Sequence, residues 1–430
     1  MSRFSAFLTR GFRAGLLLLA GVVRVSATFT DVATSAGLNV VAPPPVEDPF
    51  PVGIDRYTSG YATCAVDLDR DGWTDLILAQ NPRRCLVFMN NRNGTFREEG
   101  VARGFETAVD IGGVVAGDFS NTGRTDVFMV PRNGPRYQLF VNDGTGRFTE
   151  QAVARGADST VTGEVHRGQS IGLVDFDRDG YLDLHVTEWG VTSSADDARY
   201  SVLLRNRGPS APGFFENVTN RSGLRQPRIG SVMHGYSSAW ADFDGDGYPD
   251  LSLVSDFGKS QMWWNNGNGT FTEGRQEARV GTDQNGMGVA VADFDRDGRL
   301  DFIVSSFDFG TGETVRTPFG ANRLYRNLGG RKFEDVSSQF GGVDGSWAWG
   351  TAFLDANNDT RTDLLITNGY FYEGPPVTTQ RPYLIANAKT DRTRFYLGNE
   401  FGFNEVGESW GVVDRGYGRS VAILDYDNDG

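Results

Sequence analysis

The feature that most constrains the fold of this 430-residue chain is a short acidic pattern that returns along nearly its whole length. In residues 242–250 it reads DFDGDGYPD, with aspartates at positions 1, 3, 5 and 9 and glycine at position 6. A repeat with this spacing is typical of propellers, solenoids and arrays, in which each repeat is one supersecondary unit. Seven copies begin 51 to 70 residues apart, at Asp67, Asp118, Asp175, Asp242, Asp293, Asp355 and Asp425.

Short apolar runs flank the copies and predict β-strands. A run such as CAV or GLV precedes each loop and a second run such as LILA or LSLV follows it, both short and rich in strand-forming residues. A third run ends in Asn/Gly turn residues, and a fourth begins with Phe and is soon followed by an acid. Four antiparallel strands per repeat predict an all-β fold, a seven-bladed β-propeller of four-stranded antiparallel blades.

The two ends of the chain predict how the ring closes. The first Phe-led strand, at Phe29, precedes any loop, while the last loop has no outer strand after it. We therefore expect residues 29–32 to supply the outer strand of the blade whose inner strand is residues 421–424. Because nothing supplies the second and third strands of that blade, we expect the last blade to be incomplete.

The acidic pattern has the composition of a calcium-binding loop. Four aspartates and a backbone carbonyl at position 7 supply hard oxygen ligands at a sharp glycine turn, which suits Ca²⁺. The pattern contains no nitrogen or sulfur ligand, so zinc and copper fit poorly, and Mg²⁺ is a minor alternative. The expected metal ligands are Asp67, Asp69, Asp71, Asp75, Asp175, Asp177, Asp179, Asp183, Asp242, Asp244, Asp246, Asp250, Asp293, Asp295, Asp297, Asp301, Asp355, Asn357, Asp359 and Asp363.

Two other interpretations of the pattern are weaker. EF-hand loops need an acid at position 12 and flanking helices, but position 12 here is apolar, as at Leu78 and Leu253. Solvated turns without metal would hold four negative charges about 4 to 6 Å apart, which is unfavourable in the complete copies. In the copy at Asp118, Ser120 and Thr122 replace two carboxylates, and there both interpretations stay open.

These loops, with turns such as NNGNGTF, resemble the FG-GAP/VCBS repeats of integrin-alpha-type propellers. Within that group the chain is most similar to the secreted cartilage acidic protein family and its bacterial relatives. The resemblance implies a seven-bladed propeller with Ca²⁺ between strands one and two of a blade, and an extracellular adhesion or matrix function without catalysis. Those relatives usually continue into a small C-terminal region, whereas this sequence stops inside its last loop, as a fragment would.

The first 27 residues have the pattern of a secretory signal peptide. Arg3, Arg10 and Arg13 precede the apolar run of residues 14–23, and small residues precede Thr28. We expect residues 28–430 to form the mature propeller, secreted from the cell, or periplasmic or surface-bound in a bacterium. No later run is long enough to cross a bilayer, and the net charge of −14 argues against nucleic acid as a partner.

Aromatic, Arg and His residues at the entries to the inner strands are the candidate ligand contacts, because such side chains on a rigid scaffold can anchor a partner. Inter-blade packing is the alternative role for each of them. The candidates are His166, Arg167, His234, Tyr236, Trp347 and Trp349.

The expected function is that of a calcium-binding, monomeric adhesion, matrix or protein-interaction module with an extracellular protein or glycan ligand. The alternative is a carbohydrate-binding lectin or a polysaccharide-active propeller, since fold does not fix function. An enzyme is not expected, because the chain has only three histidines and contains neither an H-E-x-x-H nor a P-loop pattern.

Overall fold

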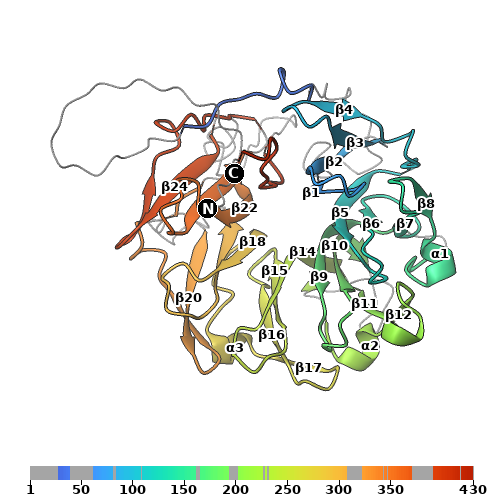
Figure 1. Cartoon of the computed structure of the whole chain (residues 1–430). Helices are drawn as coiled ribbons and strands as arrows, with labels where there is room; N and C mark the ends of the chain where they lie inside the picture. Colours follow the sequence, from blue (N-terminus) through green and yellow to red (C-terminus); the bar gives the residue numbers. More distant parts are fainter. Residues whose placement is uncertain are drawn as a thin grey trace, which may run out of the picture.

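The structure is a computed structural model in which the strands form an all-β propeller of four-stranded antiparallel blades. Figure 1 shows the sheets following one another around a ring in chain order, from blue to red. The predicted signal peptide, residues 1–27, lies outside the described residues. The structure describes residues 28–38, 62–80, 84–107, 109–160, 165–192, 202–225, 228–229, 232–307, 322–341, 343–345, 347–369, 391–416 and 418–429.

Four of the sheets are separate and have four strands each, paired in chain order. The first contains β1 (Ala62–Val66), β2 (Asp75–Gln80), β3 (Arg84–Asn90) and β4 (Phe96–Glu98). The second contains β5 (Ile111–Gly117), β6 (Asp126–Pro131), β7 (Gln138–Asn142) and β8 (Phe148–Glu150). The other two contain β18 (Gly286–Ala292), β19 (Asp301–Ser306), β20 (Arg323–Gly329) and β21 (Lys332–Asp335), and β22 (Ala348–Leu354), β23 (Asp363–Asn368), β24 (Arg394–Asn399) and β25 (Gly402–Glu405).

Two further blades are joined into one nine-stranded sheet, because β10 and β14 extend beyond their own blades and pair with each other. One half contains β9 (Gly168–Val174), β10 (Asp183–Thr192), β11 (Leu203–Asn206) and β12 (Phe215–Asn217). The other contains β14 (Val232–Ala241), β15 (Asp250–Ser255), β16 (Gln261–Asn265) and β17 (Phe271–Glu273), with β13 (Arg228–Ile229) beside β14.

Helical structure is minor in the described residues. The α-helices α1 (Ala152–Arg155), α2 (Thr219–Ser222) and α3 (Arg275–Ala278) follow outer strands, and a short 3₁₀ helix, Gly208–Ser210, lies between β11 and β12. Each α-helix has four residues, and no helix in the described part of the chain is long and apolar enough to cross a membrane.

The hydrophobic core lies between neighbouring blades. Val87 of the first blade packs in one cluster with Val127 and Met129 of the second, and all three side chains are fully buried. Buried asparagines at the ends of third strands add polar links between blades. The amide of Asn142 donates to the carbonyl oxygen of Leu68 in the preceding loop (2.9 Å), and Asn206, Asn265 and Asn327 make the equivalent bonds.

The two ends of the described chain lie between the blade of β22–β25 and the blade of β1–β4. The Phe29 backbone N–H donates to the carbonyl of Trp410 (2.6 Å), and the Ala36 carbonyl accepts from the Phe96 N–H (2.8 Å). At the other end, the Tyr426 carbonyl accepts from the Asn90 amide (2.8 Å). The last described segment therefore contacts the first blade in the same way as an acidic loop contacts the next blade, by accepting a bond from the asparagine of its third strand.

The strands expected at residues 29–32 and 421–424 are not formed within residues 28–38 and 418–429. A strand needs a ladder of hydrogen bonds to a neighbour, and no strand pairs with residues 421–424 in the described part of the chain. The predicted all-β propeller of four-stranded antiparallel blades is confirmed, whereas the described strands do not show a seventh blade. Sheets are present for six of the seven repeats, and the seventh repeat has no sheet among the described residues.

Candidate metal centres

Each complete acidic loop joins the first and second strands of a blade, and two positions of left-handed backbone set its shape. Position 4 has φ between 51° and 80° in all seven copies, and position 6 has φ between 68° and 91° in the six copies where it is described. Glycine adopts this region without the steric cost of other residues, which explains the glycine at position 6. The exception is Thr360, which has φ 68° in the loop that begins at Asp355.

The aspartate at position 1 stabilises the turn itself. Its two oxygens accept backbone N–H groups, in the first loop from Asp71 to Asp67 Oδ1 (3.1 Å) and from Gly72 to Asp67 Oδ2 (2.8 Å). The loop at Asp118 makes the same pair of bonds, from Thr122 (3.0 Å) and from its position-6 glycine. This loop has no acid at positions 3 or 5, so the turn forms without those two carboxylates.

The aspartate at position 9 begins the second strand and is buried. Asp75 is 1% exposed, and it accepts the backbone N–H of Leu68 at Oδ2 (3.0 Å) and of Asn90 at Oδ1 (2.8 Å). The same two bonds recur at Asp183 and Asp250. Position 9 therefore holds three parts of a blade together: the loop, the second strand and the end of the third strand.

Burial raises the pKa of the position-9 carboxyls. The pKa of Asp75 rises to about 7, because desolvation exceeds the effect of its two N–H bonds and the charges of Asp69 and Asp71 add to it. Desolvation by burial also raises the pKa of Asp183 to about 8 and that of Asp250 to about 7. A cation in the loop would act in the opposite direction and favour the ionised carboxylates.

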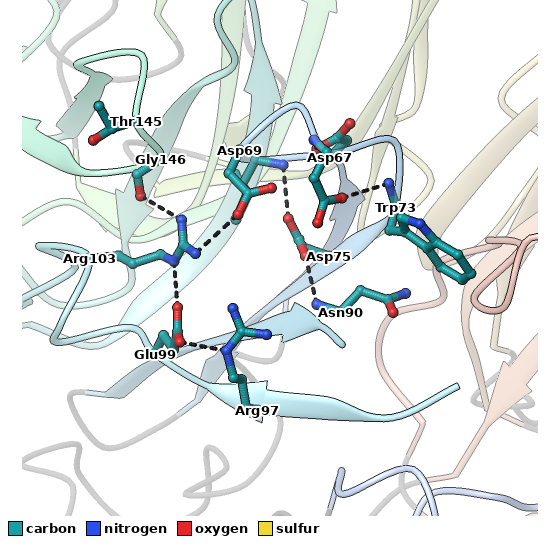
Figure 2. Close-up of polar contacts among 12 residues, drawn as sticks. Asp67, Asp69, Trp73, Asp75, Asn90, Arg97, Glu99, Arg103, Thr145 and Gly146 are labelled. Atoms are coloured by element: carbon teal, nitrogen blue, oxygen red, sulfur yellow. Dashed lines mark hydrogen bonds and ion pairs between the residues drawn. The ribbon is translucent and has the colours of Figure 1, made fainter. Parts of the chain in front are cut away.

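The aspartates at positions 3 and 5 lie close to the one at position 1. Figure 2 shows the aspartates at positions 1, 3 and 9 of the first loop, Asp67, Asp69 and Asp75, near one another. Asp69 Oδ1 and Asp177 Oδ1 are buried with no hydrogen-bond partner among the described residues, and so is Asp427 Oδ1. In five copies three carboxylates offer oxygens within 4.8 Å of one another: Asp67, Asp69 and Asp71; Asp175, Asp177 and Asp183; Asp242, Asp244 and Asp246; Asp293, Asp295 and Asp297; Asp425, Asp427 and Asp429.

Most of the expected ligands are thus brought together, and two loops stand apart. In the loop at Asp355 no such carboxylate triplet forms, because Asn357 occupies position 3 and its amide donates to Asp359 (3.0 Å). In the loop at Asp118 the Ser120 hydroxyl accepts from the Arg155 guanidinium (3.4 Å). The last loop was not among the sites expected from the sequence, yet its three aspartates cluster like those of the complete copies.

Arginine side chains contact the acids at positions 3 and 5, and sequence reasoning missed them. Arg103, in the turn after β4, is paired with Asp69 (3.1 Å) and with Glu99 (2.8 Å), as Figure 2 shows. Arg205 of β11 and Arg326 of β20 reach the acids of their own loops. Both directly precede a buried asparagine in a third strand, so an Arg-Asn pair in that strand is the signal that could have found them.

The candidate ligand residues are more buried than the sequence suggested. His166 is fully buried, with Nδ1 2.7 Å from Glu188 Oε1 and Nε2 2.5 Å from the Ser159 carbonyl oxygen, so it is a core residue rather than an exposed one. The Arg167 N–H donates to the same carboxylate, at Oε2. His234, Trp347 and Trp349 are buried too, while Tyr236 is half-buried.

Two G-x-S-x-G runs, residues 168–172 and 407–411, raise the question of a serine nucleophile. That motif needs a sharp strand-to-helix turn. Ser170 instead lies within β9, and Ser409 lies in the turn after β25, where its hydroxyl donates to the Val406 carbonyl (2.9 Å). Neither serine has the local structure of a nucleophile elbow.

Comparison with known families supports the repeat pattern. A family model described as FG-GAP-like repeat matches residues 67–129, 118–186 and 242–304. Each match begins at an acidic loop and ends in the second strand of a blade. The chain therefore carries FG-GAP-like repeats.

The chain is also similar to curated proteins over about half its length. It is 28% identical over 218 residues to Cartilage acidic protein 1 of Xenopus tropicalis, which covers 48% of this chain and 29% of that protein. The human protein of the same name is 26% identical over 231 residues, which cover 50% of this chain and 31% of that protein. The chain thus spans about a third of the length of these relatives.

Among solved structures, one described as an Agrocybe aegerita lectin that recognises non-reducing terminal N-acetylglucosamine is 17% identical to this chain. The alignment covers 83% of this chain and 84% of that one, with a TM-score of 0.47.

Proposed function

We propose that this chain, an FG-GAP-repeat β-propeller related to cartilage acidic protein 1, is a secreted module that binds calcium and contacts an extracellular partner in adhesion or matrix assembly. The observation that carries the proposal is the set of acids at loop positions 3 and 5, because one copy of the loop forms its turn without them. The copy at Asp118 forms the same turn with Ser120 and Thr122 there. In five other copies acids from these positions lie in clusters of three carboxylates, and Asp69 and Asp177 bury oxygens that have no hydrogen-bond partner in the described structure.

Calcium fits this donor set better than other divalent cations. The ligands are oxygens only, and Ca²⁺ accepts six to eight of them in flexible geometry, whereas Mg²⁺ demands a near-ideal octahedron. One Ca²⁺ would neutralise half of the formal charge of the four aspartates in a complete loop. The residues that would hold it are the aspartates at positions 1, 3, 5 and 9 with the carbonyl of position 7, and Asn357 would take position 3 in the loop at Asp355.

We also propose that the repeats close as a seven-membered ring, with the ends of this chain in the seventh place. The bond from the Phe29 N–H to Trp410 has the same form as those from Phe148 to Arg103 and from Phe403 to Phe340, which join successive outer strands. At the axis, the Ser420 hydroxyl lies 2.9 Å from that of Thr63 in β1. These contacts support the seventh position, although its second and third strands are missing from this sequence.

The extracellular setting is supported by the signal-peptide pattern of residues 1–27 and by relatives that are named for cartilage. A rigid ring whose loops are fixed by bound cations offers a preorganised surface to a partner, and preorganisation lowers the entropic cost of binding. Calcium would then be required for adhesion through the order of the loops.

The test counts bound calcium and then removes one site. Elemental analysis and calorimetric titration of the purified chain should find about five ions, one for each loop with a near-complete ligand set. Asp69→Asn should remove or weaken one of them at least tenfold, whereas Asp344→Asn, an exposed acid outside the loops, should change nothing. A chain that binds no calcium in either assay would refute the proposal.

Adhesion is tested separately on the calcium-loaded chain. Immobilised protein should support attachment of cells or of matrix components in calcium and lose it in EGTA. A glycan array run in parallel distinguishes the lectin alternative, since saturable binding of a defined sugar would identify a glycan as the partner. Attachment that does not depend on calcium would contradict the link between the loops and adhesion.

A further inference from the structure

A cavity of about 290 Å³ lies on the axis of the ring, away from the acidic loops. Residues of the inner strands β1, β5, β9, β14, β18 and β22 line it, together with residues 419–421. Its volume is near the lower end of the range for small-molecule pockets, roughly 300–1,000 Å³. No aspartate or glutamate is among the described residues that line it, although the whole chain has a net charge of −14.

One wall of this axial cavity is aromatic and cationic. The Arg419 guanidinium lies over the Trp349 indole, with Cζ 4.0 Å from the ring centroid. Both side chains donate to the carbonyl oxygen of Gly369, each at 2.8 Å, so their positions are fixed relative to each other. Tyr236 completes the wall, with its ring centroid 6.1 Å from that of Trp349. Stacked guanidinium groups are well suited to bind planar carboxylates.

Hydroxyl side chains lie among the glycine and apolar residues that line the rest of the cavity. The hydroxyls of Thr63 and Ser420 face each other at 2.9 Å, and that of Ser237 donates to the Met287 carbonyl (2.6 Å). Thr351 is different, because its Oγ1 is buried and has no hydrogen-bond partner among the described residues. A buried hydroxyl without a partner is unfavourable by about 1–3 kcal/mol, and such groups in native proteins call for a bound molecule or another explanation.

We propose that the axial cavity binds a small hydroxylated carboxylate of about the size of one monosaccharide, such as a uronic acid. Arg419 would bind the carboxylate, the hydroxyls of Thr351 and Ser237 would bind ring hydroxyls, and Trp349 and Tyr236 would pack against the apolar edge of the ring. This site goes beyond the proposed function and does not rest on it, because none of the acidic-loop residues line the cavity.

The experiment titrates sodium glucuronate into the full chain by calorimetry, with glucose as the neutral control. Glucuronate should bind saturably and at least tenfold more tightly than glucose, because only the acid can pair with Arg419. Arg419→Gln should weaken glucuronate at least tenfold. Thr351→Val should weaken it about threefold to tenfold, as expected for the loss of one hydrogen bond.

Thr351→Val keeps the test independent of folding. The hydroxyl it removes has no partner to lose, so its melting temperature should be unchanged or higher. Thr107→Val is the matched control, since the Thr107 hydroxyl is also buried without a hydrogen-bond partner in the described structure but does not line the cavity. That variant should bind glucuronate like the unaltered chain.

Three results would overturn the inference: no saturable glucuronate binding, equal affinity for glucose and glucuronate, or Thr351→Val binding as tightly as Thr107→Val. None of these results bears on calcium, which is measured at the loops. Failure of this site and failure of the calcium proposal are therefore distinguishable.

Discussion

Substitution by asparagine should affect two aspartates of the first loop differently when calcium is absent. Asp75, at position 9, accepts two backbone N–H groups and is buried, whereas Asp69, at position 3, has one buried oxygen without a hydrogen-bond partner among the described residues. Asp75→Asn should therefore destabilise the fold whether or not calcium is present. Asp69→Asn should destabilise it only when calcium is present.

The magnitudes follow from the contacts. An asparagine at position 75 has one carbonyl oxygen for two donors, so either the Leu68 or the Asn90 N–H is left unpaired, which costs about 1–3 kcal/mol. At position 69 the ion pair with Arg103 is largely buried, with side chains 13% and 20% exposed. An asparagine keeps an oxygen that can accept from Arg103, and repulsion within the loop falls, so the net cost without calcium should be about 1 kcal/mol or less. In calcium at 100 times its dissociation constant, losing that site removes about 2.7 kcal/mol.

The assay is urea unfolding followed by tryptophan fluorescence at about pH 8, above the pKa of about 7 of Asp75. Each variant is measured in excess EGTA and in excess calcium, with Asp344→Asn as the surface control. The division of roles would be refuted if Asp69→Asn were as destabilising in EGTA as Asp75→Asn. It would also be refuted if calcium stabilised the Asp69→Asn variant as much as the unaltered chain.

Three further predictions concern pH, backbone strain and ring closure. In EGTA the raised pKa of Asp75 means that folding favours the protonated carboxyl, so stability should fall as pH rises through about 7 and recover on acidification. Calcium should abolish or reverse this trend, which thermal melts measure. Thr360→Gly should raise the free energy of unfolding by about 0.5–1 kcal/mol, because Thr360 has φ 68°. Gly298→Thr, at the equivalent position of another loop, should lower the free energy of unfolding by at least about 1 kcal/mol in the same denaturation assay. Asn90→Ala should be as destabilising as Asn142→Ala, about 2 kcal/mol, since each amide donates one buried bond to the neighbouring loop and one part-buried bond to its own loop. A cost half as large at Asn90 would mean that the end of the chain is not docked there.

Local pattern in the sequence predicted the blades well, because each strand carries its own signal. Asn-Gly and Asp-Gly turns, Phe-led outer strands and aspartates before second strands all act within a few residues of one another. The acidic loops were predictable for the same reason, since glycine at position 6 reports the left-handed backbone that the turn needs. The exception at Thr360 shows that the loop tolerates one unfavourable residue when the other contacts remain.

Contacts between blades were not predictable, because they join residues far apart in the sequence. His166 looked like an exposed group at a strand entry, but Glu188 of β10 and Tyr137 of the preceding blade enclose it, with the Tyr137 hydroxyl donating to the same carboxylate (2.9 Å). The pairing of Arg103 with Asp69 depends on the turn after the outer strand folding back over the loop. No local pattern in the sequence indicates either of these contacts.

The degraded loop at Asp118 separates the two roles of the acidic pattern within this one chain. It keeps aspartate at positions 1 and 9, Asp118 and Asp126, where the carboxylates accept backbone N–H groups. It has lost acids only at positions 3 and 5, where Ser120 and Thr122 stand. Because the turn forms with the first pair alone and a cation would need all four positions, this copy has the residues of a structural turn without the full set of a metal site. We therefore expect the contribution of the Asp118 loop to stability to stay the same when calcium is removed.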